Sequence, residues 1–198
     1  GDTFPEAVAV LDPKRSDCNY PYKELSGCGV GFKLIQALSG KLDIPFDDIT
    51  HFLDLVVVSI ASDIVPITGE NRILAYFGLQ QLTKSARTGL QAIKNVSAFN
   101  DKNITIEEII FKIGPRLNAA GRMESGRTAV ELLVSEDMEN AMSISKNINL
   151  INTERRDVDT SITRQAVEMI QKNKLLWEQK STVLYKPEWH KGVIGIVA

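Results

Sequence analysis

The sequence predicts an α/β fold that is mostly helical. Two short apolar runs, Ala7–Leu11 and Thr182–Tyr185, have the length and residue types of short strands. The segments between them show helical spacing, and residues 138 to 174 contain neither proline nor glycine. This uninterrupted stretch predicts a single long helix of roughly 50 Å, which would connect two bodies.

Four further segments between these runs are apolar or show helical spacing. Leu25–Leu42 has apolar residues at helical spacing, and Thr88–Val96 continues the helical pattern. Phe52–Val65 is so apolar that periodicity alone does not decide between a buried strand and a buried helix. Gly69–Leu82 is typical of an amphipathic helix. Its inward face is expected to hold Ile73, Leu74, Phe77 and Leu82.

A helix start is predicted at Thr105. Threonine is a good N-cap, and the acidic Glu107 and Glu108 that follow favour the positive end of the helix dipole. This helix should stop near Gly114, because Pro115 is suited to the first turn of a new helix. A helix that begins at Pro115 would direct free N–H groups at an anion.

The composition is that of an ordinary globular protein, with 43% hydrophobic and 24% charged residues among 198. A net charge of −2 argues against binding to nucleic acid through bulk positive charge, although arginines can still gather in one groove. The sequence has no run of about 18 apolar residues and no signal-peptide pattern, so we expect no membrane span and a cytoplasmic location. Cys18 and Cys28 lack metal-ligand spacing and are expected to be free thiols.

Asp63 is a candidate metal ligand. It lies at the end of an apolar element, where a carboxylate is costly to bury unless it is paired, hydrogen-bonded or bound to a cation. Aspartate oxygens suit hard cations such as Mg²⁺ and Mn²⁺. The alternative is a cap for the helix that follows Pro66, and position alone favours neither interpretation.

Residues 114–123 (GPRLNAAGRM) set Arg116, Asn118 and Arg122 among small residues. Small side chains allow close approach to the backbone, and guanidinium groups match phosphate oxygens in pairs. This pattern indicates a phosphate site. Composition alone, however, favours a tightly packed helix junction with solvated arginines.

Arg155 and Arg156 lie in the predicted long helix. Seven residues bring a helix back to nearly the same direction, so Arg155 lies over Ile148 on the apolar stripe. A charge there needs a partner, which is either a carboxylate of the protein or a bound phosphate.

His190, Lys191 and Gly192 precede an apolar segment of helical character at the end of the chain. A histidine beside a lysine at such a position is suited to bind a phosphate or hold a leaving oxygen. A lone histidine is more often structural or solvated.

Together these motifs resemble those of the RecJ exonucleases of the DHH phosphoesterase superfamily. The resemblance rests on GPRLNAAGRM, on the Asn-x-Glu-Arg-Arg pattern at 152–156 and on WHKGVIGIVA at 189–198. Residues 61–72 (ASDIVPITGENR) are similar to the family's motif around its last metal-binding aspartate, and residues 11–30 look like the stretch just downstream of its Asp-His-His motif. The resemblance covers essentially the whole chain in the correct order.

The resemblance implies three parts. Residues 1–136 would be the C-terminal part of a DHH catalytic domain, 137–176 a connecting helix, and 177–198 the truncated start of a DHHA1-type domain. The family's Asp-His-His and Asp-x-Asp motifs are absent from this sequence. The chain is therefore expected to be an internal fragment that lacks most of the metal ligands and is inactive by itself.

The implied function is single-stranded-DNA-specific 5′–3′ exonuclease activity that releases 5′-mononucleotides with Mn²⁺ or Mg²⁺, in DNA repair and recombination. Single-stranded DNA is the implied partner, and a helicase and a single-strand-binding protein are further expected ones. The resemblance makes Asp63 a metal ligand and catalytic residue. The expected DNA- or phosphate-binding residues are Arg116, Asn118, Arg122, Arg155, Arg156, His190, Lys191 and Gly192.

Two alternatives stand beside this interpretation. A DHH-family small-nucleotide phosphodiesterase or oligoribonuclease shares the chemistry, but not GPRLNAAGRM together with the long Glu-Arg-Arg helix. A non-catalytic RecJ-like scaffold in a replication complex often loses the metal aspartate, which is present here as Asp63. Intact metal motifs upstream would decide in favour of the nuclease.

Overall fold

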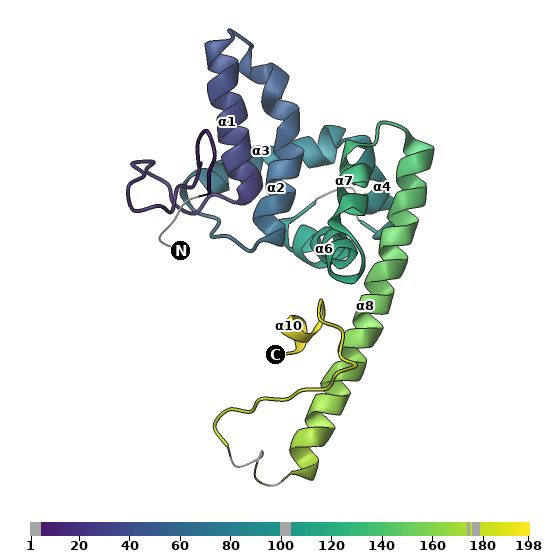
Figure 1. The fold of residues 1–198 in the computed structure, drawn as a ribbon. Helices are drawn as coiled ribbons and strands as arrows, with labels where there is room; N and C mark the ends of the chain where they lie inside the picture. Colours follow the sequence, from purple (N-terminus) through teal and green to yellow (C-terminus); the bar gives the residue numbers. More distant parts are fainter. Residues whose placement is uncertain (1–4, 100–103, 174, 176–178) are drawn as a thin grey trace.

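The chain is helical along most of its length in the computed structural model, which describes residues 5–99, 104–173, 175 and 179–198 (Figure 1). Within these ranges no strand occurs. The helical segments are α1 Gly27–Lys41, η1 Phe46–Phe52, α2 Leu53–Ser62, α3 Gly69–Ser85, α4 Thr88–Val96, α5 Ile106–Glu108, η2 Ile109–Ile113, α6 Gly114–Met123, α7 Gly126–Val134, α8 Met138–Lys172 and α10 Ile194–Val197. The helical part of the predicted fold is confirmed.

The two predicted strands are wrong for the described structure. Residues 7–11 and 182–185 both form irregular chain, and Val8 and Val183 are almost completely exposed to solvent. A strand needs a neighbour that accepts and donates its backbone hydrogen bonds. The described residues supply no such neighbour for either segment.

Helix α2 is the centre of the core. Val56, Val57 and Ile60 have no exposed surface, and the helix packs against α1, α3 and the η2–α6 segment. Burial on every side explains why Phe52–Val65 shows no periodicity. The structure shows that this segment is a helix.

Helix α3 packs against α2 through small residues. A Cβ added to Gly78 would lie 2.6 Å from the carbonyl oxygen of Leu53, so the two helices approach more closely than a side chain allows. The predicted inward face is therefore partly wrong, because Ile73 and Phe77 are 58% and 50% exposed. Leu82 is fully buried as predicted.

A buried ion pair joins α2 to the start of α4. Asp54 is 1% exposed, and its carboxylate accepts hydrogen bonds from the backbone N–H of Arg87 at 3.0 Å and from Nη2 of the same residue at 3.0 Å. Because the charge of Asp54 is fully desolvated, this pair fixes the position of the Arg87 backbone relative to α2.

Thr105 begins its helix as predicted, with a capping box formed by Thr105 and Glu108. The helix does not stop at Gly114, however. A π-helical turn, η2, leads directly into α6, and the N–H of Gly114 donates to the carbonyl of Ile109. The wider turn accommodates Pro115, which lacks an N–H. Helix α6 therefore offers no free N-terminus to an anion, and that expectation is wrong.

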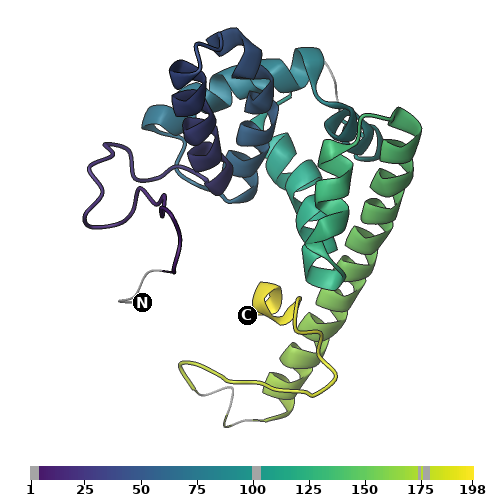
Figure 2. The same cartoon turned by 45° about the horizontal axis from the view of Figure 1, so that its top comes forward.

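Helix α8 confirms the long-helix prediction, with 35 residues from Met138 to Lys172. Its first half packs against α4, α6 and α7, while its second half continues beyond the helical body (Figures 1 and 2). The C-terminal segment folds back beside this second half and ends in α10, below α6 in Figure 1. Cys18 and Cys28 are free thiols, as predicted. Within the described ranges, no helix has the length and apolar character needed to cross a bilayer.

Candidate functional site

A cavity of about 330 Å³ lies where the end of α2, helix α6, helix α8 and the C-terminal segment meet. We call it the arginine cavity. One part of its lining is apolar and comes from Ile64, Ile110, Pro115 and Ile196. The polar part of its lining comes from Ser62, Asn118, Arg122 and Arg155.

Arg155 is the main cation of the arginine cavity. Its side chain is 14% exposed, and its nearest carboxylate contact is long, at 3.9 Å from Nη1 to Oδ2 of Asp159. Nε of Arg155 is buried and has no hydrogen-bond partner in the described part of the chain. Ile148 is fully buried on the same face, as predicted from the spacing of seven. A desolvated guanidinium with an unused donor favours an anion in this cavity.

Ser62 supplies a second unused group. Its Oγ is buried without a partner in the described structure, and it lies beside Gly114, where an added Cβ would meet it at 3.0 Å. Ser62 and Arg155 both line the cavity, and a hydroxyl and a guanidinium are donors suited to the oxygens of a phosphate. Ser62 is not among the residues expected from the sequence, where its position directly before Asp63 is the available signal.

Arg122 joins α6 to the C-terminal segment. Its Nη1 donates to the carbonyl oxygen of Gly192 at 3.3 Å, and the residue is exposed and lines the cavity. Gly192 is packed so tightly that an added Cβ would overlap the carbonyl oxygen of Arg122. The motifs at 114–123 and 189–198 are therefore in direct contact.

Arg116 lies outside the lining of the arginine cavity and braces α6 against α8. Its Nε donates to Oδ1 of Asn149 at 2.9 Å, and its Nη1 donates to the carbonyl of Lys112 at 2.7 Å. Burial and the nearby positive charge of Arg156 lower the pKa of Arg116. Arg156 itself is exposed on α8 and adds positive charge next to the cavity wall.

His190 and Lys191 also lie outside the cavity lining. Nδ1 of His190 accepts a hydrogen bond from the N–H of Gly192 at 3.2 Å, which closes a tight turn before α10, while Lys191 is exposed. The structure thus brings Arg122, Asn118 and Arg155 together in one cavity. The other predicted DNA-binding residues lie outside its lining, and Gly192 among them contacts Arg122.

Asp63 lies at the C-terminal end of α2, between two residues that line the cavity. It is exposed, and its Oδ2 accepts a hydrogen bond from Oγ of Ser59 at 3.1 Å. Helix α3 begins at Gly69 with Thr68 as its N-cap residue. The interpretation of Asp63 as a cap for that helix is therefore wrong.

The described residues do not by themselves fit a divalent metal ion. They contain no group of three or more His, Cys, Asp or Glu side chains placed to hold one. Asp63 supplies one carboxylate, whereas Mg²⁺ and similar ions need several oxygen ligands.

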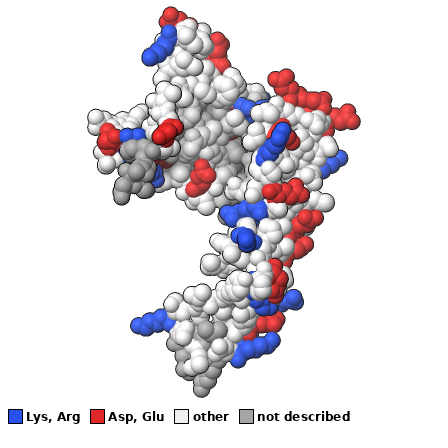
Figure 3. All heavy atoms as spheres, viewed as in Figure 1, with Lys and Arg blue, Asp and Glu red and all other residues white. Residues whose placement is uncertain are grey.

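Charge is distributed unevenly over the surface. Figure 3 shows Lys and Arg side chains gathered where the helical body meets α8, and Asp and Glu side chains along the outer edge of α8. A net charge of −2 is thus compatible with a local cationic surface.

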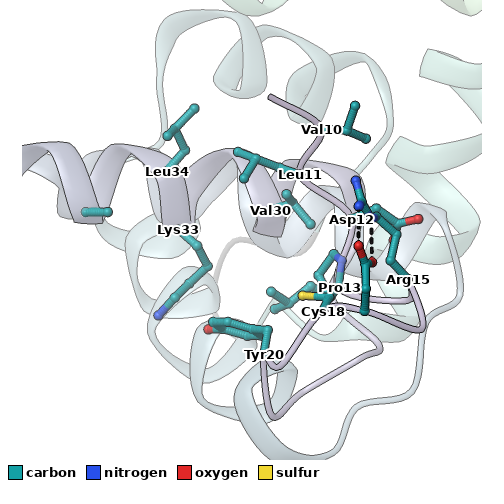
Figure 4. Close-up of a pocket in the computed structure, with 13 residues that line it drawn as sticks. Val10, Leu11, Asp12, Pro13, Arg15, Cys18, Tyr20, Val30, Lys33 and Leu34 are labelled. Atoms are coloured by element: carbon teal, nitrogen blue, oxygen red, sulfur yellow. Dashed lines mark hydrogen bonds and ion pairs between the residues drawn. The ribbon is translucent and has the colours of Figure 1, made fainter. Parts of the chain in front are cut away.

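A second cavity, of about 430 Å³, lies between the N-terminal loop and α1 (Figure 4). It is mainly apolar, and its charged groups are used within the protein. Arg15 Nε donates to Asp17 at 2.8 Å, and Lys33 Nζ lies 2.9 Å from Glu70. Arg15 and Lys33 therefore each have a close carboxylate partner, whereas the contact of Arg155 with Asp159 is long, at 3.9 Å.

The proteins that this chain resembles are single-stranded-DNA-specific exonucleases. They carry the name RecJ: the chain is 38% identical to RecJ of Bacillus subtilis and 35% identical to RecJ of Haemophilus influenzae, each over the whole of this chain. The chain spans 24% and 36% of the lengths of these two relatives. No family model matches the sequence.

Solved structures agree with the sequence comparison. Manganese-bound RecJ from Thermus thermophilus superposes on the whole chain with a TM-score of 0.81 at 30% identity, with 28% of the RecJ chain covered. A second manganese-bound exonuclease RecJ gives a TM-score of 0.84 at 30% identity, with 48% of that chain covered. The resemblance to RecJ is confirmed in both sequence and fold, for a part of that protein.

Proposed function

We propose that this chain is part of a single-stranded-DNA-specific exonuclease and that the arginine cavity binds a phosphate of the DNA backbone. The observation that carries this proposal is the buried Nε of Arg155, which has no protein partner in the described structure and belongs to a residue that lines a cavity together with Ser62, Asn118 and Arg122. Contacts to phosphate give affinity without reading sequence, as an exonuclease requires.

The proposal also includes a divalent metal ion next to the arginine cavity. The RecJ structures that resemble this chain hold Mg²⁺ or Mn²⁺. Asp63, next to the cavity, would contribute one oxygen ligand, and the remaining ligands would come from parts of a longer protein. Bound there, the ion would activate water and stabilise charge on the scissile phosphate.

The finer expectations belong to this proposal as well. They are 5′–3′ polarity with mononucleotide release, a role in DNA repair and recombination, delivery by a helicase and a single-strand-binding protein, and a cytoplasmic location. The division into DHH, connector and DHHA1 parts at 1–136, 137–176 and 177–198 also rests on the resemblance to RecJ. The similar proteins are named as exonucleases, which does not favour the small-nucleotide alternative.

Binding of labelled DNA tests the proposal. We would titrate the chain into a fluorescein-labelled single-stranded oligonucleotide at low salt and follow anisotropy, with the matching duplex as competitor. Arg155→Met should weaken binding about tenfold, because a charge-assisted hydrogen bond is lost. Arg127→Met is the matched control, since Arg127 is exposed on α7 and pairs with Glu131 at 3.0 Å. Equal affinities of the two variants, or tighter binding of duplex, would contradict the proposal.

A further inference from the structure

The returning C-terminal segment is attached to α8 through Gln165. Oε1 of Gln165 accepts hydrogen bonds from Nζ of Lys186 at 2.8 Å and from Nε1 of Trp189 at 3.2 Å. Its Nε2 donates to Oγ of Ser161, one turn earlier on α8, at 3.3 Å. Gln165 thus uses both ends of its amide, one toward the segment and one toward its own helix.

The chemistry of these partners determines what residue 165 must provide. Lys186 and the indole of Trp189 can only donate, so the atom between them must be an acceptor with two lone pairs. An amide oxygen satisfies this requirement, and so does a carboxylate oxygen. An aliphatic side chain of similar size leaves Trp189 without this acceptor and leaves Lys186 with its longer contact to Glu188, at 3.8 Å.

A second attachment lies a few residues further along the segment. Gly192 accepts from Arg122 of α6, and Val193 is completely buried. His190 and Lys191 therefore lie between an attachment to α8 and an attachment to α6. Their distance from the arginine cavity depends on both attachments.

We propose that Gln165 is a positioning residue that, acting through Trp189 and Lys186, holds His190 and Lys191 next to Gly192, which contacts Arg122 of the arginine cavity. This inference rests on the proposed function where it concerns DNA. The attachment itself can be measured without DNA. No motif in the sequence points to Gln165, because its role arises only where the segment folds back on α8.

The test uses the full chain in a Trp177→Phe background, so that Trp189 is the one remaining tryptophan. In Gln165→Leu, Trp189 emission should change, and tryptic cleavage after Lys191 should become roughly tenfold faster, because cleavage follows the open population of the segment. Gln165→Glu should match the parent chain in both measurements. Gln171→Leu, an exposed exchange on the same helix, should also match it.

Single-stranded DNA affinity is measured on the same variants. It should fall about fivefold in Gln165→Leu and return in Gln165→Glu. Unchanged emission and cleavage in Gln165→Leu, or a Gln165→Glu variant that behaves like Gln165→Leu, would overturn the attachment. A changed segment with unchanged DNA affinity would overturn the positioning role. A parent chain that does not bind DNA would instead contradict the proposed function and leave the attachment in place. Circular dichroism checks that each variant is folded.

Discussion

Gly192 and Arg122 are in contact across seventy residues of sequence, with Nη1 of Arg122 3.3 Å from the carbonyl oxygen of Gly192. The Cα of Gly192 lies so close to α6 that an added Cβ would overlap the carbonyl oxygen of Arg122. The resemblance assigned the two motifs to different parts of the chain, residues 1–136 and 177–198. In the structure they are in direct contact beside the arginine cavity.

The close contact predicts a specific effect of Gly192→Ala. Because the added methyl group would meet backbone rather than a movable side chain, the C-terminal segment should detach from α6. Tryptic cleavage after Lys191 should then be at least about tenfold faster than in the parent chain.

Gly195→Ala is the matched control, because a Cβ there has no neighbour within 4 Å. It should leave the cleavage rate unchanged. Equal cleavage rates for Gly192→Ala and Gly195→Ala would show that the segment is not docked as described.

The close packing of α3 on α2 predicts that glycine-to-alanine substitutions at two positions have opposite effects on stability. Gly78→Ala places a methyl group 2.6 Å from the carbonyl oxygen of Leu53 and should destabilise the chain by about 1–3 kcal/mol. Gly31→Ala, in α1, meets no atom within 4 Å and should stabilise it by about 0.5–1 kcal/mol, because alanine is the better helix former. Chemical denaturation of both variants measures this, and a stabilising Gly78→Ala would refute the close packing.

The cluster formed by Glu70, Tyr20 and Lys33 predicts a pH dependence of stability. Burial raises the pKa of Glu70, but hydrogen bonds from Tyr20 and Lys33 outweigh it and lower that pKa below its ordinary value of 4.5. A carboxylate whose pKa is lower in the folded state stabilises the fold above its ordinary pKa and loses this effect as pH falls through the folded value.

The difference in unfolding free energy between the parent chain and Glu70→Gln should therefore be largest near neutral pH. It should shrink as pH falls below 4.5. Urea denaturation at a series of pH values measures it. A difference that grows on acidification would have the wrong sign for this cluster.

The single carboxylate at the candidate metal position predicts that this chain alone does not cut DNA. With Mn²⁺ or Mg²⁺ added, a 5′-labelled single strand should bind without release of mononucleotides, because Asp63 has no partner ligands among the described residues. Metal-dependent release that disappears in Asp63→Asn would show that the chain holds a complete metal site.

Local patterns predicted the helices well. The absence of proline and glycine from 138 to 174 predicted α8, and Thr105 followed by Glu107 and Glu108 predicted a helix start. The predicted strands at 7–11 and 182–185 failed because strand formation depends on a neighbouring strand, which no local pattern reveals. The inward face of α3 was partly wrong because Gly78 allows a closer approach than large apolar side chains do.

The site was predictable only in part. A spacing of seven placed Arg155 on the buried face of α8, and the small residues around Arg122 indicated a close approach. Gln165 carries no sequence signal of its own, and the signal for Ser62 is only its position directly before Asp63. Their roles depend on contacts between segments far apart in the chain, which arise only in the folded structure.

The salt dependence of single-stranded DNA affinity tests the central claim most directly. Each phosphate neutralised by a cation contributes about −0.7 to the slope of log affinity against log salt for single strands. If Arg155 binds a phosphate, the slope for Arg155→Met should be shallower than that of the parent chain by about 0.7, while Arg127→Met keeps the parent slope. An Arg155→Met slope identical to that of the parent chain would contradict the assignment of the arginine cavity as a phosphate site.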